Sequence, residues 1–127
     1  MIALDASVLI AHLNHLDAHH GPATALLRDA AVDELRVHGS TLAEVLVGGV
    51  RVGRGAAMRE DLRAAGIRVA PTDDDEPLRL AELRASSGLK LPDCCVLDVA
   101  VRARAALATF DEALAAAART RGVAVLP

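Results

Sequence analysis

The chain has 127 residues, of which 53% are hydrophobic and 24% charged, a balance typical of one globular domain and not of a disordered protein. Its net charge of −3 excludes a protein that binds polyanions through a general basic excess. It has no Trp or Tyr and a single Phe, Phe110, which excludes the aromatic base-stacking surface of single-strand-binding proteins. No apolar run has the length of a membrane span, and no basic lead-in of a signal peptide opens the chain. We therefore expect a cytoplasmic protein with one domain over residues 1–127.

Short apolar runs alternate with segments of helical periodicity. In chain order, we expect a strand at Ile2–Leu4, a helix at Val8–Leu13, a helix at Pro22–Val32, a strand at Leu35–Val37, a helix from Ser40 or Thr41 to the pair Gly48-Gly49, a strand at Ile67–Ala70, a helix from about Glu76 to Ser87, a helix from Pro92, a strand at Ala105–Thr109, a helix at Asp111–Arg121 and a strand at Val123–Leu126. A fully apolar strand such as Ile2–Leu4 is expected to be buried on both faces. The order predicts an α/β fold with a parallel sheet covered by helices on both faces.

Two groups of potential metal ligands have simpler interpretations. Cys94 and Cys95 are adjacent, so they are poorly placed to staple the fold or to bind a metal ion, and we interpret them as buried reduced thiols. His12, His15 and His19 have helical spacing, but no fourth ligand has a fixed place near them. We therefore favour a solvated loop over residues 14–22.

The segment VGGVRVGRGAAMRED, residues 47–61, is rich in glycine but lacks the GK[ST] ending of a phosphate-binding loop. Its glycines favour a loop between helices. Four arginines in and after it are expected on an exposed face: Arg51, Arg54, Arg59 and Arg63. A charged face of this kind is most often simply solvated, and a role in gripping RNA or a partner is the alternative.

Four acidic residues lie at the ends of predicted strands or at the helix starts that follow them: Asp5, Glu44, Asp93 and Asp111. In a parallel sheet these places gather at one edge, so the four carboxylates could share a pocket. Each acid also has a simpler explanation. Thr41 to Glu44 fits a capping box, and the other three would cap or stabilise helix N-termini.

Taken together, these four carboxylates predict a metal site. Converging carboxylates without basic partners would repel one another and raise each other's pKa unless a cation lies between them. Oxygen ligands with open positions suit Mg²⁺ or Mn²⁺. Such an ion can activate water for attack at phosphorus, so the pattern predicts phosphodiester hydrolysis.

Asp98 is excluded from this set. It lies five residues after Asp93, roughly 140° round a helix of 3.6 residues per turn. Arg102 is four residues further along the same predicted helix, so an ion pair between Asp98 and Arg102 accounts for this acid.

The chain resembles PIN-domain proteins, and closely resembles the VapC-type toxins of bacterial toxin–antitoxin pairs. The resemblance covers nearly the whole chain and rests on four segments in this order: IALDASVLI, STLAEVLVG, GLKLPDCCVLDVAV and LATFDEAL. Any one segment alone is weak evidence, whereas all four in a chain of this length are specific. The resemblance implies a three-layer α/β/α fold with a five-stranded parallel sheet.

The resemblance also implies a ribonuclease that depends on Mg²⁺, for which Mn²⁺ can substitute. The family's acids map onto a catalytic set, Asp5, Glu44, Asp93 and Asp111, of which we expect Asp5, Asp93 and Asp111 to be metal ligands. Ser7 and Thr109 match the family's small polar residues, which we expect to hold carboxylates or water. The implied partners are RNA, a VapB-type antitoxin that wraps the toxin and blocks its site, and a second copy of the chain. At the positions of Asp98 and the Cys94-Cys95 pair, many relatives carry apolar residues.

Three alternatives remain open from the sequence. A PIN-domain ribonuclease of RNA processing, without a toxin role, would carry the same residues. A receiver-like module would need a paired acid early in the chain and a late lysine, but Asp5 has no acidic neighbour and Lys90 precedes Asp93. A PIN-like binding protein with a dead site would not need all four acids. The RNA target is open, and with so few aromatic residues we expect recognition through RNA shape and arginine contacts to the backbone.

Overall fold

The computed structural model describes all 127 residues. Its elements are, in chain order, β1 (Ile2–Leu4), α1 (Ala6–Leu13), α2 (His20–Asp29), β2 (Leu35–Val37), α3 (Gly39–Arg51), α4 (Gly55–Ala64), β3 (Ile67–Val69), α5 (Glu76–Ser87), α6 (Leu91–Ala103), β4 (Ala106–Ala108), α7 (Glu112–Thr120) and β5 (Val125–Leu126). Each predicted strand is present: β1 and β2 have the predicted bounds, and β3, β4 and β5 are shorter. None of the helices is both long and apolar enough to cross a membrane.

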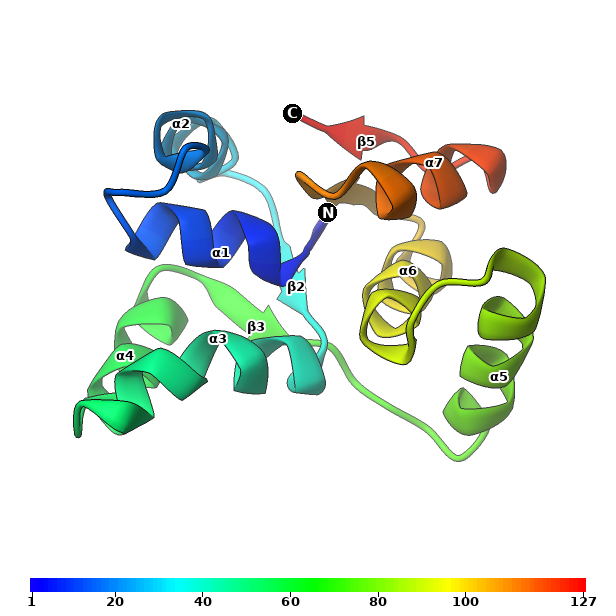
Figure 1. The fold of residues 1–127 in the computed structure, drawn as a ribbon, viewed down its shortest axis with the longest axis horizontal. Helices are drawn as coiled ribbons and strands as arrows, with labels where there is room; N and C mark the ends of the chain where they lie inside the picture. The colour runs from blue at the N-terminus through cyan, green and yellow to red at the C-terminus, as the bar shows by residue number, and fades with distance from the viewer.

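The five strands form one parallel sheet in the order β3-β2-β1-β4-β5 (Figure 1). Ile2 of β1 is paired with Leu35 of β2 on one side and with Ala106 of β4 on the other. β1 is therefore the central strand, and the residue that follows it lies in the middle of the carboxyl edge. Parallel neighbours require crossover connections, and here helices supply them. The predicted α/β/α fold is confirmed.

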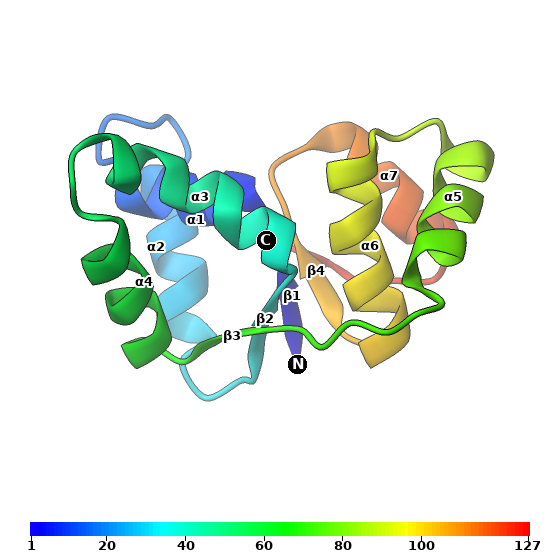
Figure 2. The same cartoon turned by 90° about the horizontal axis from the view of Figure 1, so that it is seen from below.

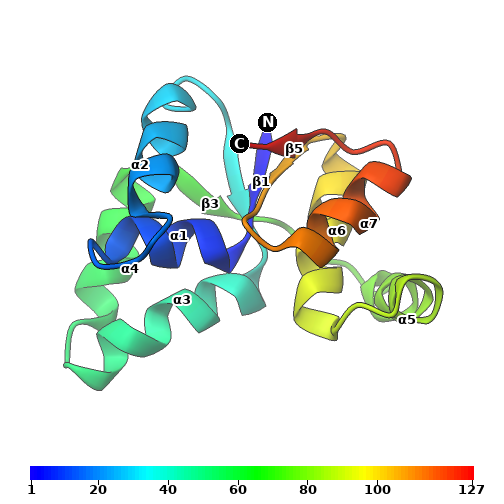
Figure 3. The same cartoon turned by 45° about the horizontal axis from the view of Figure 1, so that its top comes forward.

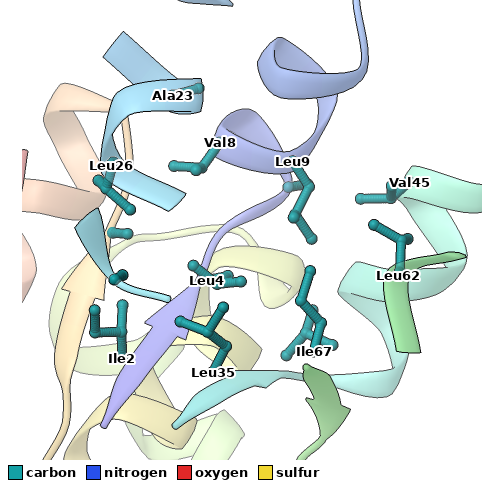
Figure 4. Packing of buried hydrophobic residues seen from close by; sticks show 14 of the residues in the cluster. Ile2, Leu4, Val8, Leu9, Ala23, Leu26, Leu35, Val45, Leu62 and Ile67 are labelled. Carbon is teal, nitrogen blue, oxygen red and sulfur yellow. The ribbon is translucent and has the colours of Figure 1, made fainter. Parts of the chain in front are cut away.

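The helices divide into two layers, with α1 to α4 on one face of the sheet and α5 to α7 on the other (Figure 2). Successive residues of β1 point to opposite faces, as in any strand. Ile2 and Leu4 join a core with Leu9 and other side chains of α1 to α4 (Figure 4). Ala3 joins a second core, which contains Leu97 of α6. The central strand is therefore buried on both faces, as its unbroken apolar run predicts, whereas Arg68 and Val69 of the edge strand β3 are exposed.

The prediction that a helix ends at Gly48-Gly49 is wrong, because α3 continues through this pair to Arg51. A Cβ atom at Gly49 would lie 3.0 Å from Cε of Met58, so glycine at this position allows α4 to pack closely on α3. This packing outweighs the loss of about 1 kcal/mol that a glycine causes inside a helix. The predicted loop shrinks to residues 52–54, and Arg51 belongs to a helix.

Two helix starts also differ from the prediction. α1 begins at Ala6 instead of Val8, and α2 begins at His20 instead of Pro22. The end of α5 is as predicted: Gly88 adopts a left-handed conformation with φ of 73°, which a residue without a side chain does easily.

Candidate active site

The structure brings the four predicted acids to the carboxyl edge of the sheet. Asp5 directly follows β1, Asp93 lies in the first turn of α6, and Asp111 directly precedes α7. Glu44 is the sixth residue of α3. Figure 3 shows that the first turns of α1, α3, α6 and α7 surround the carboxyl end of β1. The four acids therefore come from separate segments of the chain and meet next to the central strand.

Asp5 is buried and held by two hydroxyl groups, and those groups belong to the two predicted supporting residues. Ser7 Oγ donates to Asp5 Oδ2 at 2.7 Å, and Thr109 Oγ1 donates to the same oxygen at 2.8 Å. Each hydroxyl has a single proton, so neither donates across the 3.5 Å that separates Ser7 from Thr109. Asp5 Oδ1 has no hydrogen-bond partner and is free to bind a ligand.

The same two hydroxyl groups also order the β4–α7 connection. Ser7 Oγ accepts from the backbone N–H of Phe110 at 3.1 Å, and Thr109 Oγ1 accepts from that of Asp111 at 3.0 Å. Asp111 Oδ1 in turn accepts from the backbone N–H of Leu114 at 2.8 Å, which caps α7. Asp111 thus caps α7 through Oδ1, as predicted, and its second carboxylate oxygen has no partner.

Asp93 and Glu44 have no hydrogen-bond or ion-pair partner among the side chains. The pKa of Asp93 is raised, chiefly because its carboxyl group is partly buried and further because Asp111, Asp5 and Glu44 lie nearby. Lys90 opposes this shift only weakly, as the last of its causes. The site is therefore a region of negative charge without a matching cation.

The predicted capping box from Thr41 to Glu44 is wrong, since α3 begins earlier. His38 is the N-cap residue, and its side chain accepts a hydrogen bond from the backbone N–H of Ser40. Glu44 therefore lies beyond the first turn, and helix capping no longer explains its carboxylate. The sequence did not show this because histidine is not among the usual capping residues.

Asp98 lies outside this group, as predicted, but the predicted pairing with Arg102 is wrong. Arg79 of α5 binds it with two hydrogen bonds, from Nε at 3.0 Å and from Nη2 at 3.1 Å. Arg102 instead pairs with Asp73 at 3.2 Å. Asp98 is buried, so a bidentate guanidinium compensates its charge more fully than an exposed helical neighbour would.

The two cysteines are free thiols, and His12 and His19 have separate partners instead of forming one ligand cluster. Cys94 and Cys95 are free and buried as predicted, and burial raises the pKa of both thiols. His12 bonds to Thr24 at 2.9 Å, whereas the ring of His19 stacks on Phe110. The predicted solvated loop is thus partly ordered.

One further cluster, which the sequence did not indicate, is formed by His38, Glu76 and Cys95. One possible ligand atom of each residue lies within 4.8 Å of those of the other two. Because the N–H of Ser40 occupies Nδ1 of His38, the ring proton is on Nε2, which donates to Glu76. A metal ion would need the lone pair of Nε2. We therefore interpret this cluster as a hydrogen-bonded link between α3 and α5. The largest cavity, about 440 Å³, adjoins this link and touches none of the four acids.

The residues around Asp5 fit a hard divalent cation. Asp5, Asp93 and Asp111 each keep at least one carboxylate oxygen without a partner. Burial and then the repulsion of the neighbouring acids raise the pKa of Asp93. All the free donor atoms are oxygens, which suit Mg²⁺ or Mn²⁺ better than zinc. A cation among them would remove the charge imbalance.

A model of the PIN domain family matches residues 2–120, nearly the whole chain. This chain belongs to the PIN domain family. No sequence among the curated proteins matches it. The four acids therefore lie within a PIN domain, at the edge of its parallel sheet.

Several solved structures share the PIN fold with this chain. FitAcB from Neisseria gonorrhoeae has a TM-score of 0.73 at 20% identity, over 100% of this chain and 97% of that one. VapBC2 from Rickettsia felis, bound to a DNA fragment from its promoter, has a TM-score of 0.72 at 16% identity, over 98% and 97%. PAE2754 from Pyrobaculum aerophilum has a TM-score of 0.63 at 21% identity, over 98% and 87%.

Proposed function

We propose that this PIN domain is the toxin of a VapBC-type pair, an endoribonuclease that depends on a divalent metal ion. The observation that carries the proposal is the group of carboxylates around Asp93, whose pKa is raised by burial first and then by three neighbouring acids. The family membership and the similarity of fold to VapBC2 and FitAcB support a nuclease of this class. Ribonucleases that process RNA without a toxin role are the alternative, and an assay of growth separates the two.

In this proposal, Asp5, Asp93 and Asp111 hold Mg²⁺ or Mn²⁺ through their free oxygens. When bound, the ion supplies an activated water and stabilises the charge that develops on the phosphate. Ser7 and Thr109 keep Asp5 in place through their hydrogen bonds to Oδ2.

Two further contacts complete the arrangement. Capping of α7 through Leu114 fixes Asp111, so its free oxygen has a set direction. Glu44 is exposed and unpaired, and we assign it the acceptance of a proton from the attacking water.

The test compares Asp5→Asn and Asp93→Asn with the parent protein in RNA cleavage and in growth arrest on induction. We expect both variants to lose cleavage by at least about 100-fold, the range seen when a catalytic group is removed. Asp61→Asn, on the exposed face of α4, is the matched control and should cleave like the parent. Cleavage by either site variant at the parent rate would overturn the proposal.

The antitoxin is expected to bind an apolar groove of about 330 Å³ between α1, α3 and α4. Ile10, Leu13 and Val47 line it, and each is 40–44% exposed. Glu44 lines the same groove, so an occupant would lie directly beside the carboxylates and block access to them.

Two aspartate substitutions test the binding of the antitoxin. Val47→Asp should release a co-expressed VapB-type antitoxin, whereas Val32→Asp, at a solvent-exposed position elsewhere, should retain it. Equal retention would contradict this binding site. The homodimer that the resemblance implies is a separate proposal, tested by light scattering.

A further inference from the structure

An aromatic stack lies next to the carboxylates and has no part in the mechanism described above. The rings of His19 and Phe110 are parallel within 5°, with their centroids 4.4 Å apart. His19 precedes α2, and Phe110 lies in the β4–α7 connection between Thr109 and Asp111. Two distant segments thus build one flat surface at the edge of the site.

Both members of the stack are held in place. Phe110 is partly buried against the core, and its backbone N–H donates to Ser7 Oγ, the hydroxyl that also holds Asp5. The backbone N–H of His19 donates to Asp17 Oδ1 at 2.8 Å, which fixes the turn that presents the imidazole. The stack is therefore tied to the catalytic carboxylates through a short chain of hydrogen bonds.

The outer face of the stack is open. One face of the His19 ring is covered by Phe110, yet 54% of its side chain remains exposed, so the accessible area belongs to the opposite face and the edges. A hollow of about 200 Å³ adjoins the stack and is lined by both rings, by Asp111 and by Arg119. Arg119 has no hydrogen-bond or ion-pair partner for its guanidinium, which leaves it free to bind a phosphate.

We propose that the His19–Phe110 stack is a platform for one unpaired nucleobase of the RNA substrate, next to the phosphate that is cleaved. The proposal rests on the proposed ribonuclease function and names its substrate as single-stranded at this position. A base lies flat on the imidazole, and Arg119 contacts the adjoining phosphate. Aromatic and histidine rings bind unpaired bases in this way without strong preference for sequence. The proposal differs from the expectation of recognition through RNA shape and arginine contacts, because a histidine supplies the outer ring of the platform.

The test uses the full chain with Asp93→Asn, which prevents cleavage and lowers the repulsion of RNA. Short single-stranded RNAs carry 2-aminopurine at one position each, and both fluorescence anisotropy and quenching are measured. We expect one position to be quenched. His19→Ala should abolish that quenching and weaken binding by about 5- to 100-fold, the loss that follows from removing one base-stacking side chain. His19→Phe keeps a stacking ring and should restore both signals.

His15→Ala is the matched control, an exposed histidine of the same connection, and should bind like its background. An RNA that lacks the base at the quenched position should lose as much affinity as His19→Ala does, with no further loss when the two are combined. Absence of quenching at every position, or equal binding by His19→Ala and His15→Ala, would overturn the platform. Cleavage by the unmodified protein is measured separately, so loss of the platform alone leaves the ribonuclease assignment standing.

Discussion

Asp93 is the residue at which the demands of the site and of folding oppose each other. Its pKa is raised by burial and by three neighbouring carboxylates, so the folded chain holds the ionised form less readily than the unfolded chain does. The free energy of unfolding should therefore be lower once this group ionises. The penalty is small because the group is partly exposed to solvent.

Substitution of this one charge should stabilise the protein without metal. In EDTA at pH 7, Asp93→Asn is expected to raise the free energy of unfolding by roughly 0.5–1 kcal/mol. The gain should disappear below about pH 3.8, the ordinary pKa of the group, where Asp93 is protonated in both states. Urea denaturation at several pH values measures this, with Asp61→Asn as control. A loss of stability at pH 7 would contradict it.

Thr109 links Asp5 to the backbone of Asp111, so its hydroxyl group should matter more than its volume. Thr109→Val leaves the N–H of Asp111 without its acceptor and removes one donor from Asp5. The free energy of unfolding should fall by about 1–3 kcal/mol. RNA cleavage should fall together with stability. Thr109→Ser restores the hydroxyl and should recover cleavage, which a purely steric role would not permit.

For single residues, the sequence predicted the site where a residue's place after a strand fixed its place in the fold. Asp5 directly follows one predicted strand, and Asp111 starts the helix after another, and such places meet at one sheet edge. Ion pairs between different helices could not be predicted from the sequence. The partner of Asp98 is Arg79, 19 residues away on another helix, and no local spacing rule indicates that contact.

α5 is the one helix in which no residue is buried. It lies at the edge of the molecule against α6 (Figures 1 and 3). Its polar anchor is the bidentate contact of Arg79 with buried Asp98, and these hydrogen bonds raise the pKa of the guanidinium further. Leu80 and Leu83 of α5 are only partly buried against the second core, so we expect the charged contact to contribute much of what fixes this helix.

Loss of this anchor should loosen α5 selectively. We expect Arg79→Met to reduce the hydrogen-exchange protection of α5 well before that of α6 or the sheet, because Asp98 loses its counter-charge. Arg102→Met, which breaks only the exposed pair with Asp73, serves as the control and should leave α5 protected. Equal protection of α5 in the two variants would show that apolar contacts hold it.

Two predicted helix boundaries are wrong because contacts with other parts of the chain outweigh local sequence preferences. Gly48-Gly49 has the composition of a helix end, but α4 lies against Gly49 and the helix continues. His38 takes the capping position that the pattern from Thr41 to Glu44 suggested for another residue. In both cases the deciding contact comes from a side chain that local sequence does not identify.

For the whole molecule, the sheet joins two cores that share no side chain but share the same backbone. Leu9 belongs to one and Leu97 to the other, and both are fully buried. Leu9→Ala and Leu97→Ala should each lower the free energy of unfolding by about 2–5 kcal/mol. Far-UV circular dichroism and hydrogen exchange should report one common transition, since neither half keeps a complete sheet alone. Two separate transitions would contradict this.

The central place of β1 has a consequence for the time at which the site appears during protein synthesis. The bond from Thr109 to Asp5 joins residues 104 positions apart, and the first acid is made long before the last. At ribosomal rates of about 5–20 residues per second, the nascent chain carries Asp5 for roughly 5–20 s before Asp111 exists. Throughout that interval the carboxylates are incomplete. A ribosome that translates this message is therefore not exposed to the assembled site of its own product until nearly the whole chain has been made.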